Sequence, residues 1–135
     1  MFTKAWLPRL ANKLVPNLPL EQGCGRKGQG SGEHLWAFMA MMEDVIDGRD
    51  VQGTREAFAM FADLHKCYDQ VWRDGLYLAL YAQGVRGPML QVVQAWLEGA
   101  EARTAWRGTL GPMVRQEQGL RQGCVLSPIL FCAFP

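Results

Sequence analysis

AFAMFADLHKCYDQVW, residues 57–72, begins with a nearly unbroken apolar run that ends at Leu64 and is followed by a polar cluster. A run of this length is too short for an independent helix and predicts a buried strand over residues 57–64. Asp63 would then lie at the end of a rigid strand, where its carboxylate could hold a hard cation such as Mg²⁺. Strands also often end in Asp because Asp favours the following turn, so this stretch alone leaves a purely structural role open.

A second informative stretch is EQGLRQGCVLSPILF, residues 117–131. Its glycines allow the backbone to approach a ligand closely. Arg121 offers a charged fork for phosphate, and Gln122 offers an amide that can bond a sugar or a base edge. A phosphate loop of the G-x-x-x-x-G-K type needs Lys and then Ser or Thr after its last Gly, but Cys124 follows Gly123 here. The stretch therefore predicts a binding loop of another kind.

Together the two stretches resemble two successive palm motifs of the reverse transcriptase domain of non-LTR retroelements, and more distantly those of group II intron enzymes. In that family the leading Asp of the first motif binds both catalytic metal ions, Mg²⁺ or Mn²⁺, and an aromatic five positions later excludes the ribose 2′-OH. The resemblance implies these roles for Asp63 and Tyr68. The second motif packs against the incoming nucleotide and the template, which implies contacts from Arg121, Gln122 and Gly123.

The pattern of elements predicts an α+β fold, with helices packed on a small incomplete sheet. Capping residues and apolar stripes predict helices over residues 32–47, 74–83 and 88–98, and another starting at Ser127-Pro128. Any helix near residues 9–15 should be short because prolines interrupt the segment, and residues 102–117 should form a hairpin with its turn at 108–111. The resemblance implies a partial right-hand polymerase, with residues 1–56 fingers-like and residues 57–135 a partial palm, in a single compact unit.

Composition favours an intracellular protein of the cytoplasm or nucleus. The chain has 135 residues, of which 49% are hydrophobic, and it contains no apolar run long enough to cross a membrane and no signal-peptide core. Its four cysteines form no C-x-x-C pair, which argues against a zinc site and a disulfide framework and favours free thiols. No membrane partner is therefore expected, and the sequence leaves the oligomeric state open.

The function implied is that of a fragment of an RNA-directed DNA polymerase that binds RNA template, DNA primer and dNTP. Polymerases use two divalent ions about 4 Å apart, and Asp63 alone cannot fix both. No Ala-Asp-Asp follows the second motif in this sequence, so the chain is expected to be inactive alone.

Two other functions remain open at this point. One is a non-catalytic nucleic-acid-binding remnant that uses its basic residues for backbone contact, namely Arg26, Lys27, Arg103, Arg107 and Arg121. The other is a small hydrolase with Asp63 and Asp69 as paired carboxylates.

Overall fold

The computed structural model describes residues 2–24, 26, 28–49 and 58–134. Helices predominate in it, and its two strands form one antiparallel sheet, so the predicted α+β class is confirmed. In chain order the elements are α1 (Phe2–Leu14), the 3-10 helix η1 (Val15–Asn17), α2 (Ser31–Ile46), α3 (Arg73–Ala82), α4 (Pro88–Glu98), β1 (Glu101–Trp106), β2 (Thr109–Arg115) and α5 (Ser127–Ala133).

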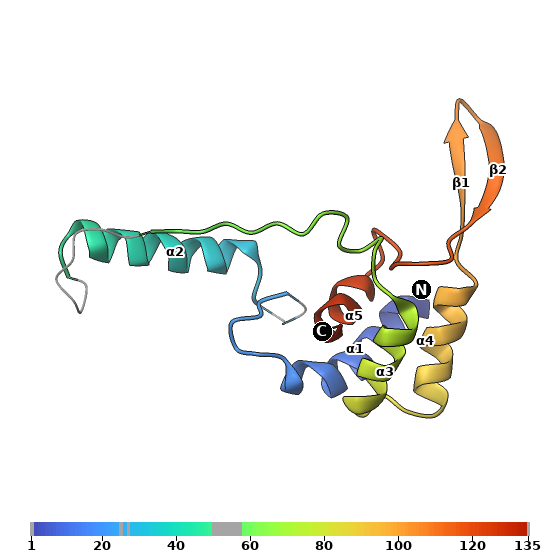
Figure 1. Ribbon diagram of the computed structural model, residues 1–135, viewed down its shortest axis with the longest axis horizontal. Helices are drawn as coiled ribbons and strands as arrows, with labels where there is room; N and C mark the ends of the chain where they lie inside the picture. Colours follow the sequence, from blue (N-terminus) through green and yellow to red (C-terminus); the bar gives the residue numbers. More distant parts are fainter. Residues whose placement is uncertain (1, 25, 27, 50–57, 135) are drawn as a thin grey trace.

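The hydrophobic core lies among α1, α3, α4 and α5, which gather at one side of the molecule in Figure 1. Helix α5 contacts both α1 and α3, and α3 also contacts α4. Leucines dominate the core because each of these helices places apolar side chains at spacings of three and four residues. The leucines with 0% exposure are Leu10, Leu14, Leu76, Leu80, Leu97 and Leu130 on these helices, and Leu120 in the loop before α5.

Helix α1 is longer than the sequence predicts. The expectation of a short helix near residues 9–15 is wrong, because α1 runs from Phe2 to Leu14 and contains Pro8 within it. Leu10 and Leu14 lie one turn apart and are both fully buried, and Trp6 and Leu7 pack against the same core. Burial of this face outweighs the hydrogen bond that proline removes from the helix.

Helix α2 matches the predicted helix, but its apolar stripe has no core to cover. None of its residues is buried, and Figure 1 shows α2 extending away from the other helices. The N-cap is Gly30, and its N–H donates to the Glu33 carboxylate at 2.8 Å. Gly48, with a φ of 67°, ends the helix as predicted.

The buried strand predicted over residues 57–64 is wrong for the part of it that the structure describes. Residues 58–64 belong to no helix or sheet and run as an extended segment in Figure 1, while residue 57 lies outside the described residues. Phe58 is 96% exposed and Phe61 is 84% exposed. A strand needs a hydrogen-bonded neighbour, and the sheet in the described part of the chain contains only β1 and β2.

The predicted hairpin is confirmed, with a tighter turn than expected. Trp106 pairs with Thr109, so the turn is Arg107-Gly108, and both residues have positive φ, 47° and 83°. The ladder shifts register between Arg103 and Ala105. The partner strand carries Pro112 there, which has no N–H to donate.

The helices do not pack on this sheet as expected. Every residue of β1 is exposed, and in β2 only Gly111 is partly covered. The helices pack on one another instead, because two short strands offer no apolar face wide enough to cover them. Among the described residues, no helix has the length and apolar character needed to span a membrane.

Candidate functional site

The two motifs are in direct backbone contact although they lie some fifty residues apart in the chain. The Leu120 N–H donates to the Tyr68 carbonyl at 2.8 Å, and the Gly119 N–H donates to the Val71 carbonyl at 3.1 Å. The Gln122 amide also donates to the Asp69 carboxylate at 3.0 Å. The turn at Tyr68-Asp69 and the loop at residues 119–123 therefore form one unit, which we call the motif junction.

Gly119 is required at this junction for two reasons. Its φ is +80°, a conformation that side chains disfavour, and a Cβ there would lie 2.7 Å from the carbonyl oxygens of both Tyr68 and Asp69. Only glycine lets the loop come this close to the turn. The glycines of this loop were expected to let the backbone approach a ligand closely. At Gly119 the close approach is to the backbone of Tyr68 and Asp69.

A cleft of about 600 Å³ opens beside the motif junction. Its lining consists of Tyr68, Gln122, Gly123, Cys124, Val125, Ser127 and Pro128. The Tyr68 ring stacks on Phe131 of α5, with centroids 5.0 Å apart and planes 25° apart, and this contact fixes the ring in position. The sequence suggested that Ser127 would cap α5. Its hydroxyl does not do so and donates to the Arg121 carbonyl at 2.5 Å. The cleft thus combines an aromatic wall with an exposed amide at Gln122.

The structure brings three of the predicted site residues to this cleft and leaves two outside its lining. Tyr68, Gln122 and Gly123 line it, whereas Asp63 and Arg121 do not. Asp63 is exposed in the extended segment 58–64. Among the described residues, no cluster of three or more His, Cys, Asp and Glu side chains could hold a metal ion.

Arg121 is directed towards α4. Its guanidinium donates to the Gly99 carbonyl at 3.0 Å and lies 5.2 Å from the centroid of the Trp96 ring. A cation at a helix C-terminus is stabilised by the helix dipole, so Arg121 holds the loop against the end of α4. The predicted phosphate fork is therefore engaged in an internal contact in this conformation.

Arg73 is a positioning residue that the sequence did not single out. It is 9% exposed, and its guanidinium donates to the carbonyls of Gly119 at 3.1 Å and Gln118 at 3.3 Å. Burial lowers the pKa of Arg73 below its ordinary value. The only hint in the sequence was its place at the start of the predicted helix 74–83, which gives no sign of a contact with a loop 46 residues away.

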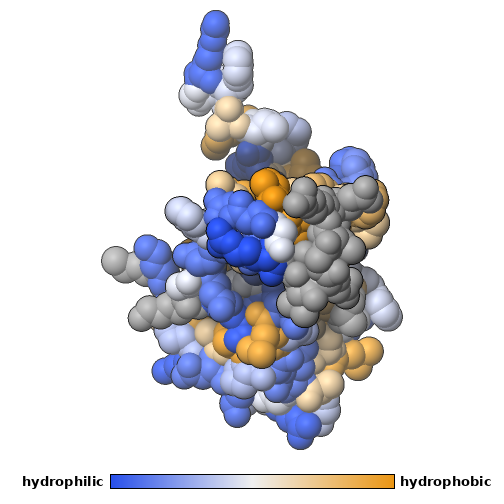
Figure 2. Space-filling model, turned by 90° about the vertical axis from the view of Figure 1, so that its left-hand side faces the viewer, coloured by the Kyte–Doolittle hydropathy of each residue, from blue (hydrophilic) through white to orange (hydrophobic). Residues whose placement is uncertain are grey.

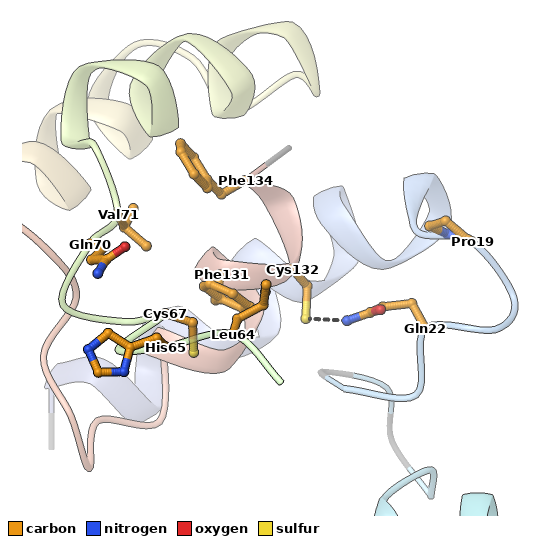
Figure 3. Close-up of a pocket in the computed structure, with 10 residues that line it drawn as sticks. All are labelled: Pro19, Gln22, Leu64, His65, Cys67, Gln70, Val71, Phe131, Cys132 and Phe134. Carbon is orange, nitrogen blue, oxygen red and sulfur yellow. Dashed lines mark hydrogen bonds between the residues drawn. The ribbon is translucent and has the colours of Figure 1, made fainter. Parts of the chain in front are cut away.

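A second pocket, of about 610 Å³, has Phe131 of α5 in its wall (Figure 3). Leu64 and His65, which follow Asp63, line it together with Cys67, Phe131 and Cys132. The Gln22 amide donates to the Cys132 sulfur at 3.2 Å, and the dashed line in Figure 3 marks this bond. The pocket therefore lies between the loop after η1 and α5.

The four cysteines are free thiols, as predicted. Cys132 donates to the Cys24 carbonyl at 3.4 Å. Partial burial, followed by the hydrogen bond with Cys132 and its charge, raises the pKa of Cys24 from 9.0 to about 11, although the residue as a whole is exposed. Burial also raises the pKa of the Tyr68 hydroxyl, and the neighbouring thiols Cys24, Cys132 and Cys67 add to this shift.

The Cys24 shift predicts a loss of stability at alkaline pH. Because the fold holds this thiol in its protonated form, its contribution to stability is complete below pH 9.0 and is lost as the pH rises towards 11. Urea denaturation at a series of pH values should therefore give a steeper decline for the wild type than for Cys24→Ala across this interval. Equal slopes for the two proteins would contradict the shift.

Comparison with known proteins places these features in a family. A family model described as reverse transcriptase (RNA-dependent DNA polymerase) matches residues 12–134. The chain is 28% identical over 76 residues to a probable RNA-directed DNA polymerase from transposon X-element of Drosophila melanogaster, covering 56% of this chain and 8% of that protein. It is 25% identical over 138 aligned positions to a probable RNA-directed DNA polymerase from transposon BS of the same organism, covering 98% of this chain and 15% of that protein.

No solved structure matches the chain. The chain spans less than a sixth of the length of these two relatives. The family model nevertheless covers nearly the whole chain, including both stretches that form the motif junction. The chain therefore belongs to the reverse transcriptase family, as its resemblance to the enzymes of non-LTR retroelements indicated.

Proposed function

We propose that this chain is a fragment of an RNA-directed DNA polymerase that helps to hold RNA template, DNA primer and dNTP. The observation that carries the proposal is the motif junction, which places Tyr68 and Gln122 on the wall of one cleft. An aromatic ring can pack against a sugar, and an amide can bond a sugar or a base edge. The family to which the chain belongs supports the choice of ligands.

Each residue of the cleft would have a distinct role. The Tyr68 ring would contact the sugar of the nucleotide and exclude a 2′-hydroxyl, and its stacking on Phe131 holds it still for this task. Gln122 would bond the nucleotide or the template once it releases the Asp69 carboxylate. Gly123, where a Cβ would meet nothing within 4 Å, leaves room for the ligand. Arg121 would act as a phosphate contact only after leaving Gly99 and Trp96.

Asp63 would supply one of the carboxylates that bind Mg²⁺ or Mn²⁺. The residues in the described part of the chain do not fit a two-metal site, because Asp63 is a single exposed carboxylate and no cluster of three or more candidate ligands is present there. The chain alone would bind its ligands without polymerising them.

The proposal also assigns the parts of the chain to a right-hand polymerase. Residues 1–56 would belong to the fingers and residues 57–135 to the palm. The motif junction and α5 then lie in the palm part, and α2 lies in the fingers part. Because RNA templates and dNTPs are found inside cells, the protein would act in the cytoplasm or the nucleus.

The alternative function, a non-catalytic nucleic-acid-binding remnant, draws support from the hairpin alone. Arg26 is engaged by the carbonyls of Leu18, Pro19 and Gln22, and Arg121 is engaged by α4. Lys27 lies outside the described residues. Only Arg103 and Arg107 of the predicted basic set remain exposed without a hydrogen-bond partner in the described part of the chain. The hydrolase alternative finds no support, since Asp69 is engaged by Gln122 and lines no described pocket with Asp63.

Replacement of Asp63 by alanine tests the proposed metal role. Titration of the wild type with Mn²⁺ should broaden the NMR signals of residues around Asp63, because carboxylate oxygen binds this ion. Asp63→Ala should lose this local broadening. The matched control is Asp44→Ala, an exposed carboxylate on α2, which should keep it. Broadening that persists in Asp63→Ala would contradict the assignment of this residue.

A further inference from the structure

The β1–β2 hairpin projects from the body of the protein and packs on no helix. In Figure 1 it rises from the end of α4, and its base is held by the Gln116 N–H, which donates to the Ala100 carbonyl at 2.8 Å. Its tip is hydrophilic and forms the top of the molecule in Figure 2. Nothing in the core depends on its side chains, since all but Gly111 are exposed. The hairpin therefore presents its side chains to solvent, where a ligand could reach them.

The hairpin carries an excess of positive charge. Residues 101–115 contain three arginines, Arg103, Arg107 and Arg115, and one acidic residue, Glu101, which gives a net charge of +2. Within the described residues, none of these arginines has an ion pair, and the one ion pair present joins Arg49 and Asp47. Their guanidinium groups are consequently free to bind an anion from solution.

The tip adds an aromatic surface to this charge. Trp106 is 75% exposed, and the Arg107 guanidinium lies 5.8 Å from the centroid of its ring. Residues that alternate along β1 face opposite sides, so Arg103 lies on the side away from Trp106 in the same short ribbon. The exposed indole provides stacking for a base, the Arg107 guanidinium beside it provides charge for a phosphate, and Arg103 adds charge on the opposite side of the ribbon.

A protein partner fits this surface less well. The exposed apolar residues Leu110, Met113 and Val114 do not share one face, because Val114 pairs with Ala102 on the side opposite to Met113. They therefore form no continuous apolar patch of the kind that protein interfaces bury.

We propose that the β1–β2 hairpin binds single-stranded nucleic acid, with Trp106 stacking on a base, Arg107 contacting the phosphate beside it, and Arg103 and Arg115 contacting phosphates where the strand crosses to the opposite face of the ribbon. Only the class of ligand rests on the function proposed above. The site itself uses neither Asp63 nor the cleft at the motif junction.

The test is binding of the full chain to a fluorescein-labelled 20-nucleotide poly(U) RNA, measured by fluorescence anisotropy in EDTA at 50 to 200 mM KCl. Trp106→Ala should weaken binding by at least about fivefold, the loss expected for one stacked base. Replacing the three arginines by alanine should reduce the slope of log affinity against log salt by about 2, since each phosphate contact on a single strand contributes roughly 0.7.

The chain offers a matched control on α3 and the loop after it. The Arg86 guanidinium lies 4.6 Å from the centroid of the Tyr81 ring, so this pair repeats the cation and ring of the hairpin on the helical body. Tyr81→Ala and Arg86→Ala should bind RNA within about twofold of the wild type. The hairpin variants should also keep the wild-type melting curve, because they remove no core contact.

Three results would overturn the inference: no RNA binding by the wild type, equal binding by Trp106→Ala, or a change in oligomeric state on Trp106→Ala, which would assign the surface to a second copy. Because the assay contains EDTA and no dNTP, these results are independent of the Mn²⁺ experiment at Asp63. Local broadening at Asp63 together with unchanged RNA binding by Trp106→Ala would refute the hairpin site and leave the proposed function standing. The reverse pattern would refute the metal role alone.

Discussion

Gly119→Ala is expected to lower the free energy of unfolding by about 3 kcal/mol or more. A residue with a side chain at φ +80° costs roughly 1 to 2 kcal/mol. The new Cβ would also lie 2.7 Å from two carbonyl oxygens, so the loop must move away from Tyr68 and Asp69. That movement would strain or break the hydrogen bonds from Gly119 to Val71 and from Leu120 to Tyr68, each contributing about 1 kcal/mol. Urea denaturation followed by tryptophan fluorescence measures the change.

Gly123→Ala provides the control in the same loop. Its φ is +77°, nearly that of Gly119, but a Cβ there would meet nothing within 4 Å. Gly123→Ala should therefore lower the free energy of unfolding only by the cost of a side chain at positive φ, roughly 1 to 2 kcal/mol. The difference between the two variants isolates the close approach between the motifs. If both variants lost the same stability, the junction would not hold the loop as tightly as described.

The sequence predicts the helices that carry their own boundary signals. Pro88 begins α4 and Gly99 follows its last residue, and Gly84, at a φ of 89°, follows the end of α3. These signals act over a few residues, so a sequence contains them in full. The same holds for the hairpin, whose alternating residues flank a turn that contains Gly108.

Segments that depend on a distant partner are not predictable in this way. The apolar run that ends at Leu64 has the composition of a strand, but a strand forms only beside another strand, and none lies beside residues 58–64 among the described residues. Helix α2 shows the related case, since its periodicity fixes the helix but not what its apolar stripe covers.

The same distinction between local signals and distant partners applies to the candidate site. The two motifs identified Tyr68, Gln122 and Gly123, and the structure brings these residues to one cleft. The orientation of Arg121 could not be predicted because it depends on Trp96 and Gly99, which reach it only through the packing of α4. Residue type indicates what a side chain can bind, and tertiary packing determines which partner it meets first.

Leu80→Ala is expected to cost about 2 to 5 kcal/mol, the range for truncating a buried leucine. Leu80 is fully buried on α3, the helix that contacts both α4 and α5, so its truncation would open a cavity in the core. The free energy of unfolding of a small domain is only about 5 to 15 kcal/mol. Because α2, the hairpin and residues 58–64 lie outside the core, this truncation would remove a large part of that free energy. Thermal and urea denaturation followed by circular dichroism would measure the loss.

Leu78→Ala makes the same chemical change on the same helix at a side chain that is 67% exposed. It leaves no cavity and alters helix propensity as Leu80→Ala does, so its effect should stay within about 0.5 kcal/mol. The contrast tests which face of α3 is buried. A loss at position 78 equal to that at position 80 would mean that the exposed face of α3 is covered in solution, and the assignment of the core to α1, α3, α4 and α5 alone would then be wrong.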